Sequence, residues 1–217
     1  MNRFDLQDKS DEYVKELADS GNYTAIFDYG YRMYNQNRYE EALAYFYKIK
    51  DYKNTFVWQM IIEIALSYLP GVISDEEIYQ FLLRRHEAGV SIYTYYLADF
   101  YEKGRGCRKS LKKYIECLAS CAYDGSSYAT IELAECYERG YAVKKSYRKA
   151  FKLYDNYLDD HCRLDYECAY RSALYMLHGL GGAKNTEYKL EYNLRYASRI
   201  NKEARSLYIE IYNKEPD

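Results

Sequence analysis

The sequence predicts an all-α protein: a right-handed α/α superhelix (solenoid) of about five helical hairpins, with a capping helix at each end and no sheet. Three observations support this prediction. A segment pattern returns after 36 residues, a glycine closes each helix-periodic stretch, and no stretch sustains the two-residue alternation of a strand. The 217 residues also include only 2 prolines and 11 glycines, too few for the turns of a sandwich or barrel.

The repeat is clearest in the second half of the chain. Residues 97–114 read LADFYEKGRGCRKSLKKY, and residues 133–150 read LAECYERGYAVKKSYRKA. A weaker third copy, SALYMLHGLGGAKNTEYKL, covers residues 172–190 at an offset of 39 to 40. In the first two copies the recurring residues are Leu97, Ala98, Tyr101, Glu102, Gly104, Lys109, Ser110 and Lys113, which return as Leu133, Ala134, Tyr137, Glu138, Gly140, Lys145, Ser146 and Lys149.

Each copy follows the same physical logic. A first helix carries a small residue (Ala98, Ala134 or Ala173) where two helices cross closely, and a glycine ends it in a left-handed cap. A short basic loop and a second amphipathic helix follow. One hairpin cannot bury its own apolar face, so neighbouring hairpins must stack.

The remaining segments extend this array in both directions. Residues 22–50 form a looser hairpin around Gly30, and residues 54–69 form a buried helix that Pro70 and Gly71 end. Ser74 and Glu77 have the spacing of a capping box for the next helix. Capping helices are expected at residues 10–20 and 201–214. With no Pro-, Gly- or Ser-rich linker, residues 1–217 read as a single solenoid.

These residues resemble the Sel1-like repeat family, a relative of the tetratricopeptide repeat. The segment 91–200 resembles Sel1-like repeats, and 22–90 looks more like tetratricopeptide hairpins, between capping helices at 1–21 and 201–217. Tyr141 stands for the second glycine of the pattern, and Tyr114 for an alanine. The resemblance implies a scaffold or adaptor that binds other proteins without catalysis. The matching residues are Leu97, Ala98, Tyr101, Gly104, Gly106 and Cys107, then Leu133, Ala134, Tyr137, Gly140, Val143, Lys149 and Ala150.

Composition limits the remaining classes. The formal net charge is -2, which argues against a dedicated nucleic-acid or membrane-surface protein, and 48% apolar residues argue against disorder. No run of about 20 apolar residues exists to span a membrane. The first residues lack a secretory signal, so we expect a cytoplasmic protein, monomeric or weakly dimeric, without a cofactor. Its 31 tyrosines suit a thin structure with many half-buried positions.

Cysteines and histidines give no recognisable active site. Cys117 and Cys121 share a helical face and Cys162 follows His161, but no C-x-x-C pair for structural zinc is present. A shift of 36 places Cys107, Cys117, Cys121 and Cys136 at apolar positions of the adjacent repeat, so we expect core packing rather than a metal or disulfide. None of His86, His161 and His178 lies in a catalytic motif, and we predict no enzyme.

Basic residues gather in the loops between paired helices. Stacked repeats would align them into a ridge that binds nucleic acid, another polyanion or an acidic protein, unless they form only a solvated edge. This predicted basic ridge comprises Arg105, Arg108, Lys109, Lys112, Lys113, Lys144, Lys145, Arg148 and Lys149.

The concave face is the preferred candidate for function. The first helix of each hairpin lines the inner surface of such a solenoid, and its inward positions lie three before and one and four after the small crossing residue. We therefore expect binding of an amphipathic, somewhat basic segment of a partner protein, although packing between repeats also explains most tyrosines. The predicted concave set is Phe27, Tyr31, Tyr34, Tyr95, Asp99, Glu102, Ile131, Glu135, Glu138, Tyr170, Leu174 and Leu177.

Overall fold

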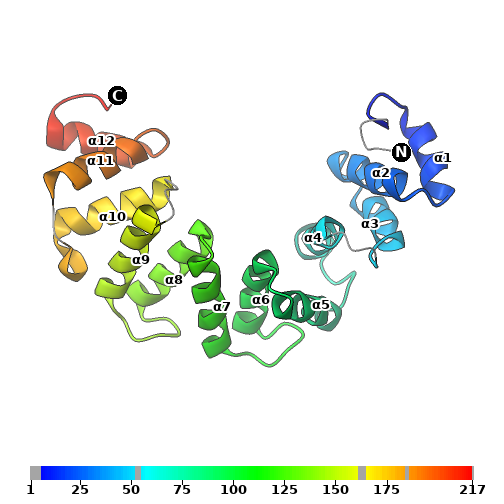
Figure 1. Ribbon diagram of the computed structural model, residues 1–217, viewed down its shortest axis with the longest axis horizontal. Helices are drawn as coiled ribbons and strands as arrows, with labels where there is room; N and C mark the ends of the chain where they lie inside the picture. Colours follow the sequence, from blue (N-terminus) through cyan, green and yellow to red (C-terminus); the bar gives the residue numbers. More distant parts are fainter. Residues whose placement is uncertain (1–5, 52–54, 161–164, 184–185, 217) are drawn as a thin grey trace. The chain divides into compact units, whose positions relative to one another are not determined.

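The computed structural model describes residues 6–51, 55–160, 165–183 and 186–216, and these residues form helices and no strand (Figure 1). The predicted all-α fold of stacked hairpins is confirmed. The α-helices are α1 (Asp11–Asp19), α2 (Tyr23–Asn35), α3 (Tyr39–Lys48), α4 (Thr55–Glu63), α5 (Asp75–Glu87), α6 (Ser91–Lys103), α7 (Leu111–Tyr123), α8 (Ser127–Arg139), α9 (Tyr147–Asp160), α10 (Tyr166–His178), α11 (Glu187–Ala197) and α12 (Lys202–Tyr212).

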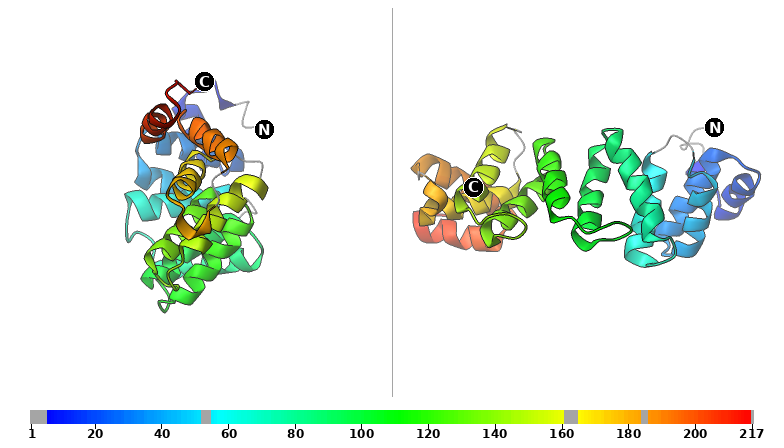
Figure 2. Two further views of the ribbon diagram at one scale, coloured as in Figure 1. Left: turned by 90° about the vertical axis from the view of Figure 1, so that its left-hand side faces the viewer. Right: turned by 90° about the horizontal axis from the view of Figure 1, so that it is seen from below.

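The chain divides into two compact units, Met1–Ile78 and Tyr79–Asp217. In the first unit α1 packs on α2 and α2 on α3. In the second unit each helix from α6 to α12 packs on the next along the chain (Figures 1 and 2). That both units form one continuous solenoid stays a prediction. No helix in the described residues is long and apolar enough to cross a membrane.

In the second unit, the first helix of each repeat (α6, α8 and α10) ends at a glycine, as predicted. Gly104, Gly140 and Gly179 have φ angles of 75°, 74° and 62°, in the left-handed region that costs glycine least. At Gly140 an added Cβ would lie 3.1 Å from Cβ of Lys145, so the close approach of the loop also requires a residue without a side chain. These caps fix where each hairpin turns.

The turn after each cap has the same hydrogen bonds in both strong repeats. The amide of Ser110 donates to the carbonyl of Tyr101, and that of Ser146 to the carbonyl of Tyr137, both at 2.8 Å. Each serine hydroxyl then accepts from an amide of the first turn of the next helix, at 3.3 Å in both cases. The sequence repeat is therefore a repeat of backbone contacts.

One position in this turn differs between the repeats. Gly106 has a φ of 57° and Ala142, 36 residues later, has a φ of 60°. Ala142, and not Tyr141, therefore stands for the second glycine of the pattern. The expectation for Tyr141 was wrong because the backbone angle, rather than the residue type, marks the equivalent position.

Small residues bring paired helices together where the sequence predicts it. Ala98, Ala134 and Ala173 are buried. In the first unit, a Cβ added to Gly30 of α2 would lie 3.0 Å from the Phe46 ring of α3, so only glycine fits this approach without a shift.

The predicted buried helix before Pro70 ends in a π-helical turn. Residues Ile64–Tyr68 continue α4, and the amide of Leu69 donates to the carbonyl of Ile64 at 2.8 Å. Leu69 itself leaves the helical region (φ -128°, ψ 63°), because the ring of a following proline disfavours helical backbone.

In the capping box of α5, the amide of Glu77 donates to Oγ of Ser74 at 3.2 Å.

Hydrogen bonds from tyrosine hydroxyls to carboxylates connect the helices throughout both units. Most join different helices, and Glu132 and Glu138 each accept two. The pairs are Tyr29–Glu41, Tyr34–Glu63, Tyr45–Asp19 and Tyr47–Glu77 in the first unit. In the second unit they are Tyr95–Glu132, Tyr114–Glu132, Tyr141–Glu102, Tyr154–Glu138, Tyr175–Glu138 and Tyr208–Glu191.

The left-handed backbone at Ala142 makes a stability prediction. Replacing Ala142 with glycine should raise the free energy of unfolding by about 0.5–1 kcal/mol, because an L-residue in this region costs about 1–2 kcal/mol and glycine's extra backbone freedom offsets part of the gain. Urea denaturation measures the change. The matched Gly106→Ala variant should have a free energy of unfolding that is lower by a similar amount. Equal stabilities for Ala142→Gly and the parent chain would contradict the equivalence of these two positions.

Candidate functional site

Helices α6 and α8, each the first helix of its hairpin, line two neighbouring pockets in the second unit, and α7 contributes to both. Tyr95 and Glu102 lie seven residues apart on one face of α6, and Tyr128, Glu132 and Arg139 follow one face of α8. We call the two pockets together the α6–α8 groove. It lies wholly within the second unit.

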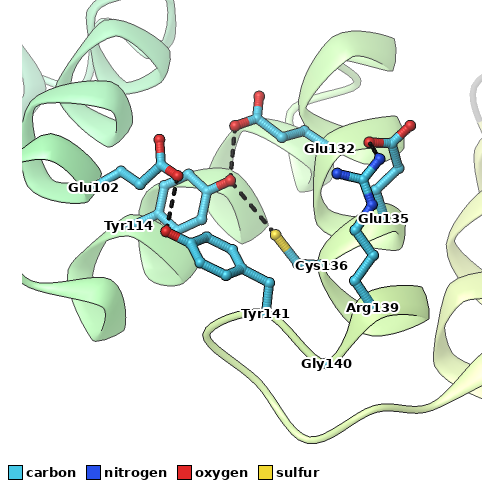
Figure 3. Close-up of a pocket in the computed structure, with 8 residues that line it drawn as sticks. All are labelled: Glu102, Tyr114, Glu132, Glu135, Cys136, Arg139, Gly140 and Tyr141. Atoms are coloured by element: carbon cyan, nitrogen blue, oxygen red, sulfur yellow. Dashed lines mark hydrogen bonds and ion pairs between the residues drawn. The ribbon is translucent and has the colours of Figure 1, made fainter.

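The acidic pocket lies at the C-terminal ends of α6 and α8. It has a volume of about 680 Å³, within the range of about 300–1,000 Å³ typical of ligand pockets. Tyr114 at its base is 3% exposed, whereas Tyr141 at its rim is 39% exposed. Figure 3 shows the lining residues: Glu102, Tyr114, Glu132, Glu135, Cys136, Arg139, Gly140 and Tyr141.

Glu132 is held in place by tyrosines from two other helices. Tyr114 of α7 donates to Oε1 of Glu132, and Tyr95 of α6 donates to Oε2, both at 2.8 Å. The Tyr114 hydroxyl also lies 3.5 Å from Sγ of Cys136. Both carboxylate oxygens of Glu132 are thereby fixed without a cation.

Tyr141 forms the opposite wall of the acidic pocket. Its hydroxyl donates to Oε1 of Glu102 at 2.9 Å, and its ring lies edge-on to Tyr114 with centroids 6.2 Å apart (Figure 3). Neither Glu102 nor Glu132 forms an ion pair with any described residue. The one guanidinium in the lining, that of Arg139, pairs with Glu135 at 3.1 Å. The lining therefore keeps two carboxylate charges that no cation of the described chain neutralises.

Shifted pKa values keep the donors of this pocket protonated. Burial, then the hydrogen bond with Cys136 and the neighbouring Glu132, raises the pKa of Tyr114. Burial and Glu132 likewise raise the pKa of Tyr95, and the bond to Glu102 raises that of Tyr141. Burial also raises the pKa of Cys136, which keeps its thiol neutral. The tyrosines therefore remain donors to carboxylates at a more alkaline pH than an ordinary tyrosine would.

The apolar pocket lies at the N-terminal ends of α6 and α8. It has a volume of about 460 Å³ and is lined by Ile92, Tyr95, Tyr96, Cys121, Asp124, Gly125, Ser126 and Tyr128. Two large apolar side chains at its rim are exposed to solvent: Ile92 is 45% exposed and Tyr128 is 76% exposed. The bond from Tyr95 to Glu132 separates this pocket from the acidic one.

Three members of the predicted concave set line the α6–α8 groove: Tyr95, Glu102 and Glu135. Asp99 pairs instead with Lys103 and, at 3.9 Å, with Arg105.

The other members predicted for the second unit mainly pack against neighbouring helices. Glu138 accepts bonds from Tyr154 and Tyr175 and pairs with Arg171, which links α8 to α9 and α10. Ile131 packs against the core cluster around Tyr154. Tyr170 and Leu177 pack against the cluster of Met176 and Leu194, and Leu174 is half-buried.

The predicted concave residues of the first unit form an aromatic ladder. The Phe27 ring stacks on Tyr31 and the Tyr31 ring on Tyr34, with centroids 6.4 Å apart in both pairs. Phe27 also contacts Phe46 of α3 at 5.9 Å, and the Tyr34 hydroxyl donates to Glu63 of α4 at 2.6 Å. The ladder thus joins α2 to α3 and α4 within this unit.

Sequence reasoning missed most of the groove. Glu132 lies two residues before the crossing alanine, a position that the inward-facing rule omits. The available signal was one departure from the repeat, because Tyr114, which stands where the next repeat has Ala150, lines the acidic pocket. The other missed residues are Ile92, Tyr96, Cys121, Asp124, Gly125, Ser126, Tyr128, Cys136, Arg139, Gly140 and Tyr141.

The predicted basic ridge is partly engaged within the chain. Lys113, Lys145 and Lys149 lie over the rings of Tyr101, Tyr147 and Tyr137 at 4.8, 4.8 and 5.0 Å. Lys112 pairs with Glu116, and Arg105 with Asp99. The other four are exposed and form no ion pair with a described residue: Arg108, Lys109, Lys144 and Arg148.

The cysteines largely take the predicted core positions. Cys117, Cys121, Cys136 and Cys168 are buried, and Cys107 is half-buried. Burial raises the pKa of Cys117 to about 12 and that of Cys121 to about 11.

No cluster of three metal-ligating side chains occurs among the described residues. Nδ1 of His86 lies 2.9 Å from Oγ1 of Thr94. His161 and the adjacent Cys162 lie outside the described residues.

Comparison with known proteins defines the fold. A Sel1 repeat protein from Oxalobacter formigenes is similar with a TM-score of 0.64 at 20% identity, covering 84% of this chain and 74% of that one. A protective antigen of uropathogenic Escherichia coli strains with an SLR fold gives a TM-score of 0.65 at 18% identity, covering 94% of this chain and 44% of that one. No protein-family model and no curated protein matches the sequence. The chain therefore has the fold of Sel1-like repeat proteins, as its resemblance predicts.

The hydroxyl of Tyr114 should contribute more to stability than that of Tyr141. Tyr114→Phe should lower the free energy of unfolding by about 1–2 kcal/mol, because it removes a buried donor to a carboxylate. Tyr141→Phe, the matched change at the exposed rim, should stay within about 0.5 kcal/mol of the parent chain. Urea unfolding of both variants gives the comparison. Equal effects would show that the bond to Glu132 does not hold α7 to α8.

Proposed function

We propose that the protein is a non-catalytic interaction module, an adaptor, scaffold or inhibitor, that binds a segment of a partner protein in the α6–α8 groove. The observation that carries this proposal is the groove itself, with apolar and acidic pockets on one face of two parallel first helices. Helical-repeat proteins use such surfaces to bind other proteins.

The composition of the groove supports a protein partner. Interaction surfaces are enriched in tyrosine, which gives a large contact area at low conformational cost. Tyr128 and Ile92 leave apolar surface exposed beside the apolar pocket, and burial of that surface would favour association. Tyr95 and Glu132 fix the floor between the pockets, so a partner meets a preformed surface.

The groove offers little support for catalysis. The acidic pocket contains no histidine, and the pKa of its one thiol, Cys136, is raised by burial. A thiol of this kind is a poor nucleophile. Binding therefore accounts for the site better than chemistry does.

A polyanion such as nucleic acid is the second candidate ligand, through Arg108, Lys109, Lys144 and Arg148. All four side chains are exposed: Arg108, Lys109 and Lys144 lie in equivalent loops of adjacent repeats, and Arg148 lies in the first turn of α9. Phosphate contacts of this kind would give binding that weakens steeply as salt concentration rises.

Variants of the two surfaces should separate these functions. In affinity capture from the native host followed by quantitative mass spectrometry, Ile92→Glu/Tyr128→Glu should lose the proteins that the parent chain retains. The reason is that two charges would have to be buried in the apolar pocket. The control replaces Arg108, Lys109, Lys144 and Arg148 with alanine and should retain them.

Circular dichroism and thermal unfolding would verify that both variants fold. Loss of the captured proteins only in the basic-loop variant, or their release by nuclease, would instead support the polyanion. Identical captures by all three chains would contradict the groove proposal.

A further inference from the structure

Two carboxylates of the acidic pocket, those of Glu102 and Glu132, differ in charge compensation from the other acidic residues predicted for the concave face. Asp99, Glu135 and Glu138 each pair with a lysine or arginine of the chain itself. Glu102 and Glu132 form no ion pair with a described residue and are held only by tyrosine hydroxyls. These two carboxylates both line the pocket.

Tyrosine hydroxyls position a carboxylate without neutralising it. A lysine or arginine partner would cancel the negative charge, whereas a neutral hydroxyl donates a hydrogen bond and leaves the charge in place. Tyrosine hydroxyls are neutral at neutral pH, and the raised pKa values of Tyr95 and Tyr114 extend that state to more alkaline pH. The pocket therefore presents preorganised negative charge beside two aromatic rings, Tyr114 and Tyr141, whose faces attract cations.

We propose that the acidic pocket receives a lysine or arginine side chain of the partner protein, while an apolar side chain of the same segment enters the apolar pocket. This inference rests on the proposed protein-binding function and specifies the partner that the groove selects. Charge complementarity decides the occupant: the lining keeps two uncompensated carboxylates, and its single guanidinium, Arg139, is already paired with Glu135.

The helix geometry sets the spacing that a partner must have. Tyr95 of the apolar pocket and Glu102 of the acidic pocket are seven residues apart on α6, which is about 10 Å at 1.5 Å per residue. A helical partner would match this distance with anchors seven residues apart. An extended partner would need about three residues at roughly 3.3 Å each.

Selection from a display library of random 12-residue peptides against the full chain tests the pairing. Peptides that bind should share a lysine or arginine at one of these spacings from an apolar residue. Glu102→Gln, which keeps an acceptor for Tyr141 and removes one charge, should weaken a selected peptide about tenfold in fluorescence anisotropy. Glu116→Gln, the same change on an exposed residue of α7 outside the groove, should leave the affinity unchanged.

Substitutions in the peptide, combined with Glu102→Gln in a double-mutant cycle, identify the contact. Replacing its lysine with norleucine, or its arginine with citrulline, should weaken binding to the parent chain and abolish the difference between the parent and Glu102→Gln. Selected peptides without a basic residue, or a peptide whose affinity ignores Glu102→Gln, would overturn the inference.

Failure of the wider proposal has a different signature. Peptides that lose binding to Ile92→Glu/Tyr128→Glu but do not depend on a basic residue would leave the groove function intact. Peptides indifferent to Ile92→Glu/Tyr128→Glu would overturn the groove function itself. A library that yields no binding peptide would count against both.

Discussion

Hydrogen bonds between tyrosine hydroxyls and carboxylates are the interaction on which the described packing depends. A stack of short helices has few positions far from solvent, so a side chain with an apolar ring and a polar tip suits its half-buried positions better than leucine. The chain uses the tip of that side chain to reach a carboxylate on another helix. Glu132 and Glu138 on α8 show the result most clearly, because each accepts from tyrosines of two other helices. The bonds given above for the described residues involve ten of the 31 tyrosines of the sequence.

The same interaction prepares the candidate site. Glu138 also pairs with Arg171 and serves to join repeats, whereas Glu132 keeps its charge at the edge of a pocket. The difference originates in a departure from the repeat. Where the second repeat has the buried Ala150, the first has Tyr114, whose longer side chain reaches Glu132. Tyr141 then encloses the opposite wall by bonding Glu102. Local variation of a structural repeat thus yields the α6–α8 groove, in which we propose that a partner binds.

The sequence predicts the architecture well because periodic features determine it. Features that recur every 36 residues in the sequence have the same structure in both repeats. Gly104 and Gly140 both cap a helix in the left-handed conformation, and Ser110 and Ser146 donate the same backbone hydrogen bond. The site was harder to predict because it depends on pairings between distant residues. Tyr95 and Glu132 are 37 residues apart, and no local pattern indicates that they bond. The inward-facing rule found Tyr95, Glu102 and Glu135, but it could not tell a carboxylate bound by tyrosine from one paired with arginine.

Stability as a function of alkaline pH tests the role of the tyrosine bonds most directly. Burial and the bond to Glu41 raise the pKa of Tyr29 to about 12, and burial and Glu77 raise that of Tyr47 to about 12, against about 10 in an unfolded chain. Because the folded pKa is the higher one, this contribution is complete below pH 10 and is lost as the pH rises through about 12. The free energy of unfolding in urea should therefore fall over this interval, as tyrosinate absorbance rises. A free energy that stays constant while the tyrosines ionise would contradict the account.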